Sequence, residues 1–125
     1  GTSDIDYENI KLDNGKNIFE TFPDVHFYDY TTRDDRTSAM RGDWKNYHLT
    51  FSRKEDNESK AIKVHEIFGL NVAVVFDKVP TVWQGKEVIN GDETDLRFLD
   101  KQNVIVGLTA KGKAKKDISG FTVRI

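Results

Sequence analysis

The sequence has no cysteine, two prolines, one methionine and no long apolar run. Without cysteine the chain cannot form disulfides, use a thiolate nucleophile or hold zinc or an iron–sulfur cluster through sulfur. No stretch approaches the ~18 apolar residues of a transmembrane helix, so we expect no membrane-spanning segment. Neither sign of charge predominates in the sequence. The chain has 19 Lys and Arg against 21 Asp and Glu, a net charge of −2 with no overall pull toward nucleic acid or an anionic membrane.

The chain does have enough aromatic side chains for one core, with 8 Phe, 4 Tyr and 2 Trp in 125 residues. This length supports a single domain over residues 1–125, because domains commonly contain about 100–150 residues. Residues 1–12 are polar with scattered apolar side chains, and we expect them to form a loosely ordered leader. Residues 1–3 are typical of a cloning remnant or a cut point, and the only methionine is Met40. We therefore expect that a signal or anchor segment once preceded this chain.

Apolar and polar residues alternate with a period of two from about residue 25 onward, which is typical of β-strands. This alternation predicts short strands at residues 25–30, 47–52, 61–68, 70–76, 81–83, 86–89, 96–99, 104–109 and 121–125. Gln84 and Gly85 separate two of these strands and predict a tight hairpin. One short helix is expected near Phe19, capped by Asp13 or Asn14 and ended by Pro23.

Turn residues recur every 8–12 positions along these strands, and this spacing favours an antiparallel sandwich or barrel. Alternating strand and helix units, which a parallel sheet requires, are not evident in the pattern. We therefore expect a mainly β fold, a single antiparallel sandwich or barrel-like domain with one short N-terminal helix; a β-rich α+β fold is the alternative. The positions expected to be largely buried are Tyr47, Leu49, Phe51, Val72, Val74, Phe76, Val104, Val106 and Phe121.

The long charged loop at residues 31–44 supplies the candidate binding residues Arg33, Arg36, Arg41 and Trp44. Arginine offers forked donors for carboxylate or phosphate, and Trp and Arg are enriched in binding hot spots. The alternative is a structural loop whose arginines pair with its own aspartates while Trp44 packs inward. Residues 41–43 spell Arg-Gly-Asp, but a tripeptide beside a strand is weak support for integrin binding.

Other stretches carry weaker signals. Nucleophile elbows and phosphate-binding loops are missing from the sequence, so we predict no catalytic residue and no cofactor. His26, His48 and His65 fall in expected strands without metal-ligand spacing, so we predict no metal site. Residues 90–95 gather three acids in a turn, which is typical of a solvated hairpin more than of a calcium site. Residues 111–116 contain four lysines, which could contact an anionic polymer or form a solvated hairpin tip.

Together these patterns predict a non-catalytic, extracytoplasmic binding or interaction module, such as the soluble part of a bacterial lipoprotein or another secreted or surface protein. Its expected partner is a protein or a cell-envelope component. One alternative is an enzyme whose histidines and acids come together from separate strands. Another is a nucleic-acid-binding β-barrel that uses the lysine-rich turn, although the acidic total charge argues against nucleic acid as a partner.

Overall fold

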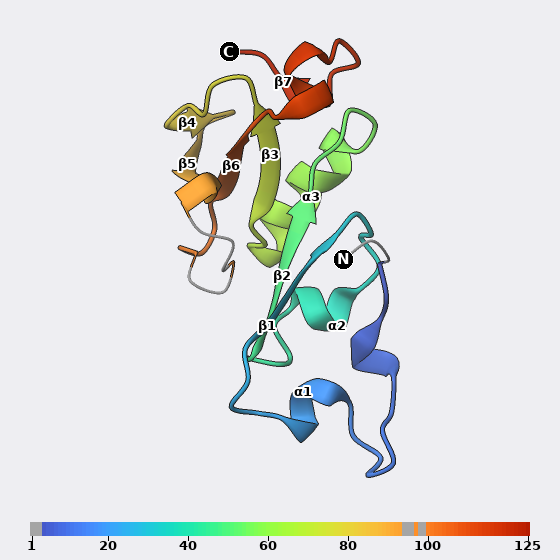
Figure 1. The fold of residues 1–125 in the computed structure, drawn as a ribbon. Coiled ribbons are helices and arrows are strands. Elements are labelled where there is room, and N and C mark those ends of the chain that lie inside the picture. Colours follow the sequence, from blue (N-terminus) through green and yellow to red (C-terminus); the bar gives the residue numbers. More distant parts are fainter. Residues whose placement is uncertain (1–3, 94–96, 98–99) are drawn as a thin grey trace.

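The computed structural model describes residues 4–93, 97 and 100–125 (Figure 1). These residues fold as a mixed α/β domain built on an open, mostly parallel sheet. The α-helices are α1 (Ile18–Thr21), α2 (Thr37–Met40) and α3 (Glu58–Phe68). The strands are β1 (Phe27–Thr31), β2 (Tyr47–Ser52), β3 (Val72–Phe76), β4 (Val82–Trp83), β5 (Lys86–Asn90), β6 (Ile105–Thr109) and β7 (Thr122–Val123). Short 3-10 turns occur at η1 (Tyr7–Asn9), η2 (Gly91–Glu93) and η4 (Gly112–Lys116).

The strand order is β1-β2-β3-β6-β5-β4, and every pair in it is parallel except the β4–β5 hairpin. β7 lies beside β3 on the same side as β2 but farther along the strand. β2 pairs with Val72 and Ala73, whereas β7 pairs with Val75 and Phe76. The expected antiparallel sandwich or barrel is therefore wrong, because the sheet is open and mostly parallel with helical crossovers. The expected mainly β fold gives way to a mixed α/β fold, because helices connect the parallel strands.

Helix α3 occupies the segment that the sequence pattern predicted to be a strand at residues 61–68. Its buried residues Ala61, Val64 and His65 are spaced by three and four, which is the period of a helix face. Gly69 ends the helix in the left-handed conformation at φ 69°, and its N–H donates to the carbonyl of His65. Parallel strands need a crossover of this kind, so α3 is what allows β2 and β3 to run in the same direction.

The other predicted elements agree more closely with the structure. α1 is the expected short helix, but Asn17 caps it instead of Asp13 or Asn14, through a capping box with Glu20. The hairpin turns at Gln84 and Gly85, both with positive φ. α2 is a four-residue helix inside the expected loop at 31–44, and the expected strand at 96–99 lies outside the described residues apart from Arg97, which is in a 3-10 turn.

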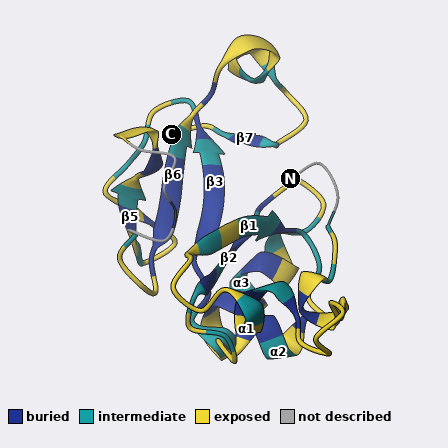
Figure 2. Cartoon of the chain, turned by 60° about the horizontal axis from the view of Figure 1, so that its bottom comes forward, coloured by how far each residue is buried: buried dark blue, intermediate teal, exposed yellow. Residues whose placement is uncertain are grey.

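The core lies between one face of the sheet and the helices, and β3 and β6 are its most buried strands (Figure 2). Phe51, Val72, Val74 and Phe76 point toward this side and belong to the same cluster as Ala61 and Val64 of α3. Eight of the nine positions predicted to be buried are buried, and Phe121 is half-buried. The last residue of the expected terminal strand, Ile125, is 65% exposed.

Candidate functional site

Five strands run parallel, and three of them, β3, β5 and β6, end close together at Phe76, Asn90 and Thr109. β1 and β2 end earlier, since Phe51 and Ser52 are level with Val72 and Ala73 at the start of β3. β1, β2 and β3 are neighbours in the order in which they occur along the chain. The β4–β5 hairpin follows in sequence, and β6 then pairs between β3 and β5, so the strand order reverses there. In open α/β sheets, ligands bind outside the carboxyl ends of the strands, where the strand order reverses. The topology therefore directs attention to the carboxyl edge near β3 and β6.

A pocket of about 350 Å³ lies at this edge. Val75 and Leu108, which are register partners in β3 and β6, contribute to its lining. Because their neighbours Val74 and Phe76 face the core, Val75 and Leu108 face the opposite side of the sheet from α3. The complete lining is Tyr30, Val75, Gly91, Asp92, Leu108, Thr109, Lys111, Ala114 and Phe121.

The polar groups of the carboxyl-edge pocket come from the turn after β5 and the end of β6. Asp92 accepts a hydrogen bond from the backbone N–H of Thr109 at 2.9 Å. The other carboxylate oxygen of Asp92 lies 3.9 Å from Nζ of Lys111, whose side chain is 79% exposed. Gly91 permits this approach, since a Cβ there would come within 2.9 Å of the side chains of Val106 and Leu108.

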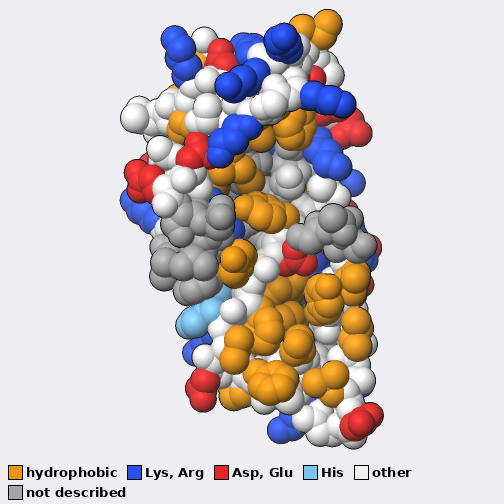
Figure 3. Space-filling model, viewed as in Figure 1, with side chains coloured by type: hydrophobic (Ala, Val, Ile, Leu, Met, Phe, Trp, Pro, Cys, Tyr) orange, Lys and Arg blue, Asp and Glu red, His pale blue; other side chains and the backbone are white. Residues whose placement is uncertain are grey.

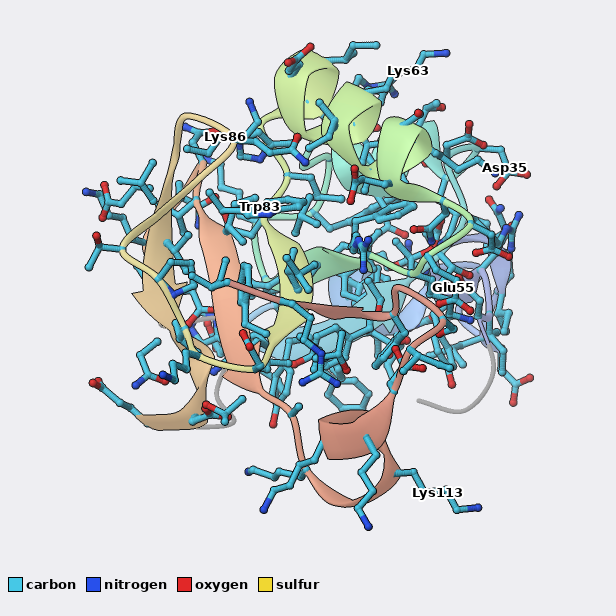
Figure 4. The ribbon with its side chains drawn as sticks, turned by 90° about the horizontal axis from the view of Figure 1, so that it is seen from above. Asp35, Glu55, Lys63, Trp83, Lys86 and Lys113 are labelled. Atoms are coloured by element: carbon cyan, nitrogen blue, oxygen red, sulfur yellow. The ribbon has the colours of Figure 1, made fainter. Side chains whose placement is uncertain are left out.

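A lysine-rich turn, residues 111–116, borders the carboxyl-edge pocket on the side of the sheet opposite α3. Figure 4 shows Lys113 of this turn and Lys63 of α3 pointing away from opposite sides of the molecule. Residues 111–125 contain five Lys and Arg and one Asp. Figure 3 shows basic side chains gathered at the end of the molecule that carries η4 and β7. The pocket therefore opens next to a strongly basic rim.

The lysine-rich turn is held in place by the residues that follow it. The hydroxyl of Thr122 donates to the carbonyl of Ala114 at 2.8 Å, and Arg124 donates to the carbonyls of Lys115 and Asp117. Asp117 accepts from Ser119 and from the N–H of Thr122, and these hydrogen bonds hold the pKa of its carboxyl below the ordinary value. These hydrogen bonds therefore hold the lysine-rich turn in a defined position.

Arg53, at the end of β2, joins this support to the rest of the sheet. Its buried guanidinium donates to the carbonyls of Gly120 and Phe121 at 2.6 and 2.8 Å and to the carboxylate of Glu58. Glu58 belongs to the first turn of α3. Arg53 therefore connects the end of β2 to α3 and to the segment at Gly120 and Phe121, which places Phe121 in the pocket.

The Gene product 88 family model matches residues 1–125. The chain belongs to the Gene product 88 family. No curated protein and no solved structure matches the chain. Among the described residues of this Gene product 88 domain, no helix has the length and apolar character needed to cross a membrane.

Two of the four predicted binding residues in this Gene product 88 domain lie in an ion-pair network. The side chain of Arg36 is fully buried and donates to Glu8, Asp4 and the hydroxyl of Tyr47. Burial disfavours the charged guanidinium, but the hydrogen bonds that Arg36 donates to Glu8 and Tyr47 outweigh this effect and raise the pKa of Arg36. Arg33 pairs with Asp6 and Asp35 and remains partly exposed. Burial raises the pKa of the Tyr47 phenol to about 12.

Arg41 and Trp44 both line a second pocket, of about 300 Å³, which also includes the start of β2. Arg41 pairs with Asp43 at 2.8 Å, so the two charged groups of the Arg-Gly-Asp tripeptide bind each other. The tripeptide follows α2 and lies in a turn, not against a strand. Trp44 is half-buried, with its ring centroid 6.0 Å from that of Phe19. The structure thus places Arg41 and Trp44 together and Arg36 in the interior; partner binding by all four residues stays a prediction.

The histidines were expected in three strands, but only His48 lies in one. His65 is in α3, where its Nδ1 lies 2.8 Å from the carbonyl oxygen of Leu70. His26 precedes β1, and its Nδ1 lies 3.2 Å from Nε2 of His48. Burial, followed by the nearby charge of His26, lowers the pKa of His48. Within the described part of the chain, no three His, Asp or Glu side chains converge as a metal-binding group.

Few features of the sequence point to the carboxyl-edge pocket. The lysine run at 111–116 is visible in the sequence, but Tyr30, Val75 and Leu108 resemble core strand residues there. Asp92 belongs to the acidic turn expected at 90–95, whose residues 94 and 95 lie outside the described residues. The parallel strand order is the observation that joins these segments, and no local motif encodes it.

Proposed function

We propose that this domain is a non-catalytic binding module that holds an anionic ligand with an apolar part in the carboxyl-edge pocket. The observation that carries the proposal is the juxtaposition of an apolar sheet surface with the lysine-rich turn. Val75, Leu108 and Phe121 supply apolar surface, and Lys111 stands at the rim. An apolar group would be removed from water against the sheet while the anionic group meets the basic rim.

The size of the carboxyl-edge pocket suits a small molecule or the end of a larger one. Ligand pockets usually enclose about 300–1,000 Å³ and combine an apolar lining with a few placed polar groups. This pocket has about 350 Å³, with Asp92, Thr109 and Lys111 as its polar members. An anionic cell-envelope component fits both this chemistry and the extracytoplasmic partner expected from the sequence.

Fluorescence of anilinonaphthalene sulfonate, which joins an apolar ring system to an anion, tests this proposal. We expect saturable binding that weakens as NaCl rises from about 50 to 500 mM, because salt screens the lysines. Lys111→Ala combined with Lys113→Ala should weaken binding, and Leu108→Gln should do the same through the apolar surface. The matched control is Lys60→Ala with Lys63→Ala on α3, which removes the same charge from the opposite side. Equal loss of binding in this control, or no effect of Leu108→Gln, would contradict the proposal.

Single-stranded nucleic acid is the second candidate ligand, and one observation favours it. Tyr30 and Phe121 line the same pocket as Lys111, so rings on which bases can stack lie beside cations that can meet phosphates. The net acidic charge of the whole chain opposes this reading. Fluorescence anisotropy with a short labelled single-stranded oligonucleotide separates the two cases. We expect no binding at physiological salt; salt-sensitive binding that is lost in the Lys111 and Lys113 variant would favour nucleic acid.

A further inference from the structure

The paired histidines His26 and His48 do not line the carboxyl-edge pocket. Phe27 pairs in register with Tyr47, and both contact the core. Side chains alternate between the two faces of a sheet, so His48, which follows Tyr47 in β2, points to the opposite face. His26 directly precedes β1. The parallel register of β1 and β2 therefore brings together two imidazoles that are 22 residues apart.

The separation of the two ring nitrogens matches that of two ligands on one metal ion. Nδ1 of His26 and Nε2 of His48 are 3.2 Å apart. Two nitrogens bound to a tetrahedral zinc ion at about 2.0–2.1 Å lie roughly 3.3–3.4 Å from each other. The two nitrogens need to move apart by only about 0.1–0.2 Å, and each imidazole must turn so that its lone pair points at the ion.

We propose that His26 and His48 form a two-imidazole site for a divalent transition-metal ion, with zinc as the reference ion. In the metal-free pair, one nitrogen carries a proton and donates it to the lone pair of the other. Binding replaces this shared proton: two nitrogen–metal bonds form, one N–H bond breaks at the bridging nitrogen, and the other ring nitrogen of that imidazole takes up the proton. Both imidazoles stay neutral, which is the form that binds metals.

The backbone around His26 is fixed in advance by Asn46. The side-chain amide of Asn46 lies 3.0 Å from the carbonyl oxygen of Val25 and also donates to the carbonyls of Phe19 and Phe22. The backbone carbonyl of Asn46 accepts from the N–H of Phe27 at 2.7 Å. The residues on both sides of His26 are thus held by one asparagine, which lowers the entropic cost of placing the imidazole on a metal.

The surroundings of the pair suit an accessible, exchangeable ion. His26 is exposed and His48 is half-buried. Asp43 and Lys45 share a surface pocket of about 370 Å³ with His26, so charges of both signs lie near the pair. With two protein ligands, water would complete the coordination shell, and the affinity would fall below that of closed structural zinc sites.

Isothermal titration of tag-free protein with zinc chloride at about pH 7.5 tests the site. We expect one equivalent to bind, and His26→Gln and His48→Gln each to weaken binding by more than about tenfold. Loss of an outer-shell partner already costs about 10–100-fold, and loss of a ligand should cost at least as much. The matched control is His65→Gln, which removes a histidine outside the pair and should leave zinc affinity unchanged. Circular dichroism checks that each variant is folded.

Nitrogen-resolved NMR of the imidazole side chains gives a second readout that does not depend on variants. We expect zinc to shift Nδ1 of His26 and Nε2 of His48 and to leave His65 unmoved. Lowering the pH to about 5.5 should release the ion, because protons then compete for both nitrogens. Zinc binding that is unchanged in the His26→Gln, His48→Gln double variant, or shifts confined to carboxylates, would overturn the site. So would the absence of zinc binding to the folded wild-type protein.

Discussion

Arg36 donates to both carboxylate oxygens of Glu8, from Nη2 at 2.7 Å and from Nε at 3.2 Å. The side chains are 0% and 1% exposed, so this is an ion pair of the interior. It connects η1 to the residue that precedes α2, two segments 28 positions apart. Tyr47 adds a third partner from β2 through its hydroxyl. The pair thus anchors the N-terminal segment against the first strands.

Replacing Arg36 with Ala should lower the free energy of unfolding by about 3–5 kcal/mol, because it leaves the buried Glu8 carboxylate without its partner. Urea unfolding followed by circular dichroism measures the change. Arg41→Ala is the matched control, since the Arg41–Asp43 pair is exposed and should contribute less than about 1 kcal/mol. Equal effects of the two substitutions would show that the buried network contributes little to stability.

Phe76→Ala should destabilise the domain by about 3–5 kcal/mol, as deletion of a buried phenylalanine does elsewhere. Phe76 has no exposed surface, and its ring meets that of Trp83 edge-on at 5.9 Å. Thermal melting should show the loss directly. Ile118→Ala serves as the control because Ile118 is 98% exposed, and its melting temperature should stay close to that of the parent. An unchanged melting temperature for Phe76→Ala would contradict the central position of β3.

Stability should fall as the pH drops below the ordinary histidine value near 6.5, in buffer that contains EDTA. The folded state lowers the pKa of His48, so the unfolded chain binds this proton more readily. The stabilisation is therefore complete above 6.5 and is lost as the pH falls through the lower, folded pKa. The free energy of unfolding between about pH 7.5 and 5.5 should decline less for His48→Gln than for the wild type. An equal decline in the variant and the wild type would show that protonation of His48 does not cause the pH dependence of stability.

Gly107→Ala should cost about 1–3 kcal/mol through overpacking. A Cβ at this position in β6 would lie 2.6 Å from Val79 and 2.8 Å from Val88, with the carbonyl of Ile89 at 3.3 Å. Chemical denaturation measures the loss. Adding Val79→Ala removes the closest clash and should recover part of the stability. If Gly107→Ala is neutral, the β4–β5 hairpin is packed less tightly against β6 than these distances indicate.

The strands could be located from the sequence because their apolar alternation is local. β2, β3 and the β4–β5 hairpin lie where the pattern places them, and their inward side chains form the core. The segment at 61–68 could not be resolved this way, since Ala61, Val64 and His65 fit a helix face while Ile62 and Val64 also fit a strand. A strand at 61–68 would leave no crossover between β2 and β3, which is why the pattern predicts an antiparallel sheet; the helix α3 supplies that crossover.

The candidate sites also differ in whether neighbouring residues in the sequence are enough to predict them. The lysine run is contiguous and was visible in the sequence. The His26–His48 contact and the Arg36–Glu8 pair depend on which strands and turns are neighbours, and neither has a characteristic spacing. The pairing of Arg33 with Asp6 reaches beyond the charged loop, whereas its pairing with Asp35 was open to prediction from that loop alone.

The position of β7 has a consequence for the order of folding. β7 docks on β3 from 47 residues away, since Val75 pairs with Thr122, and Arg53 reaches carbonyls 67 and 68 positions later in the chain. Contacts with such large sequence separation form slowly, because a long stretch of chain must close before they are made. The β1–β6 sheet can therefore assemble first, and the basic segment joins it last. Stopped-flow refolding should show Trp83 reaching its native environment before the segment that encloses the pocket, so binding competence would arrive as the final kinetic step.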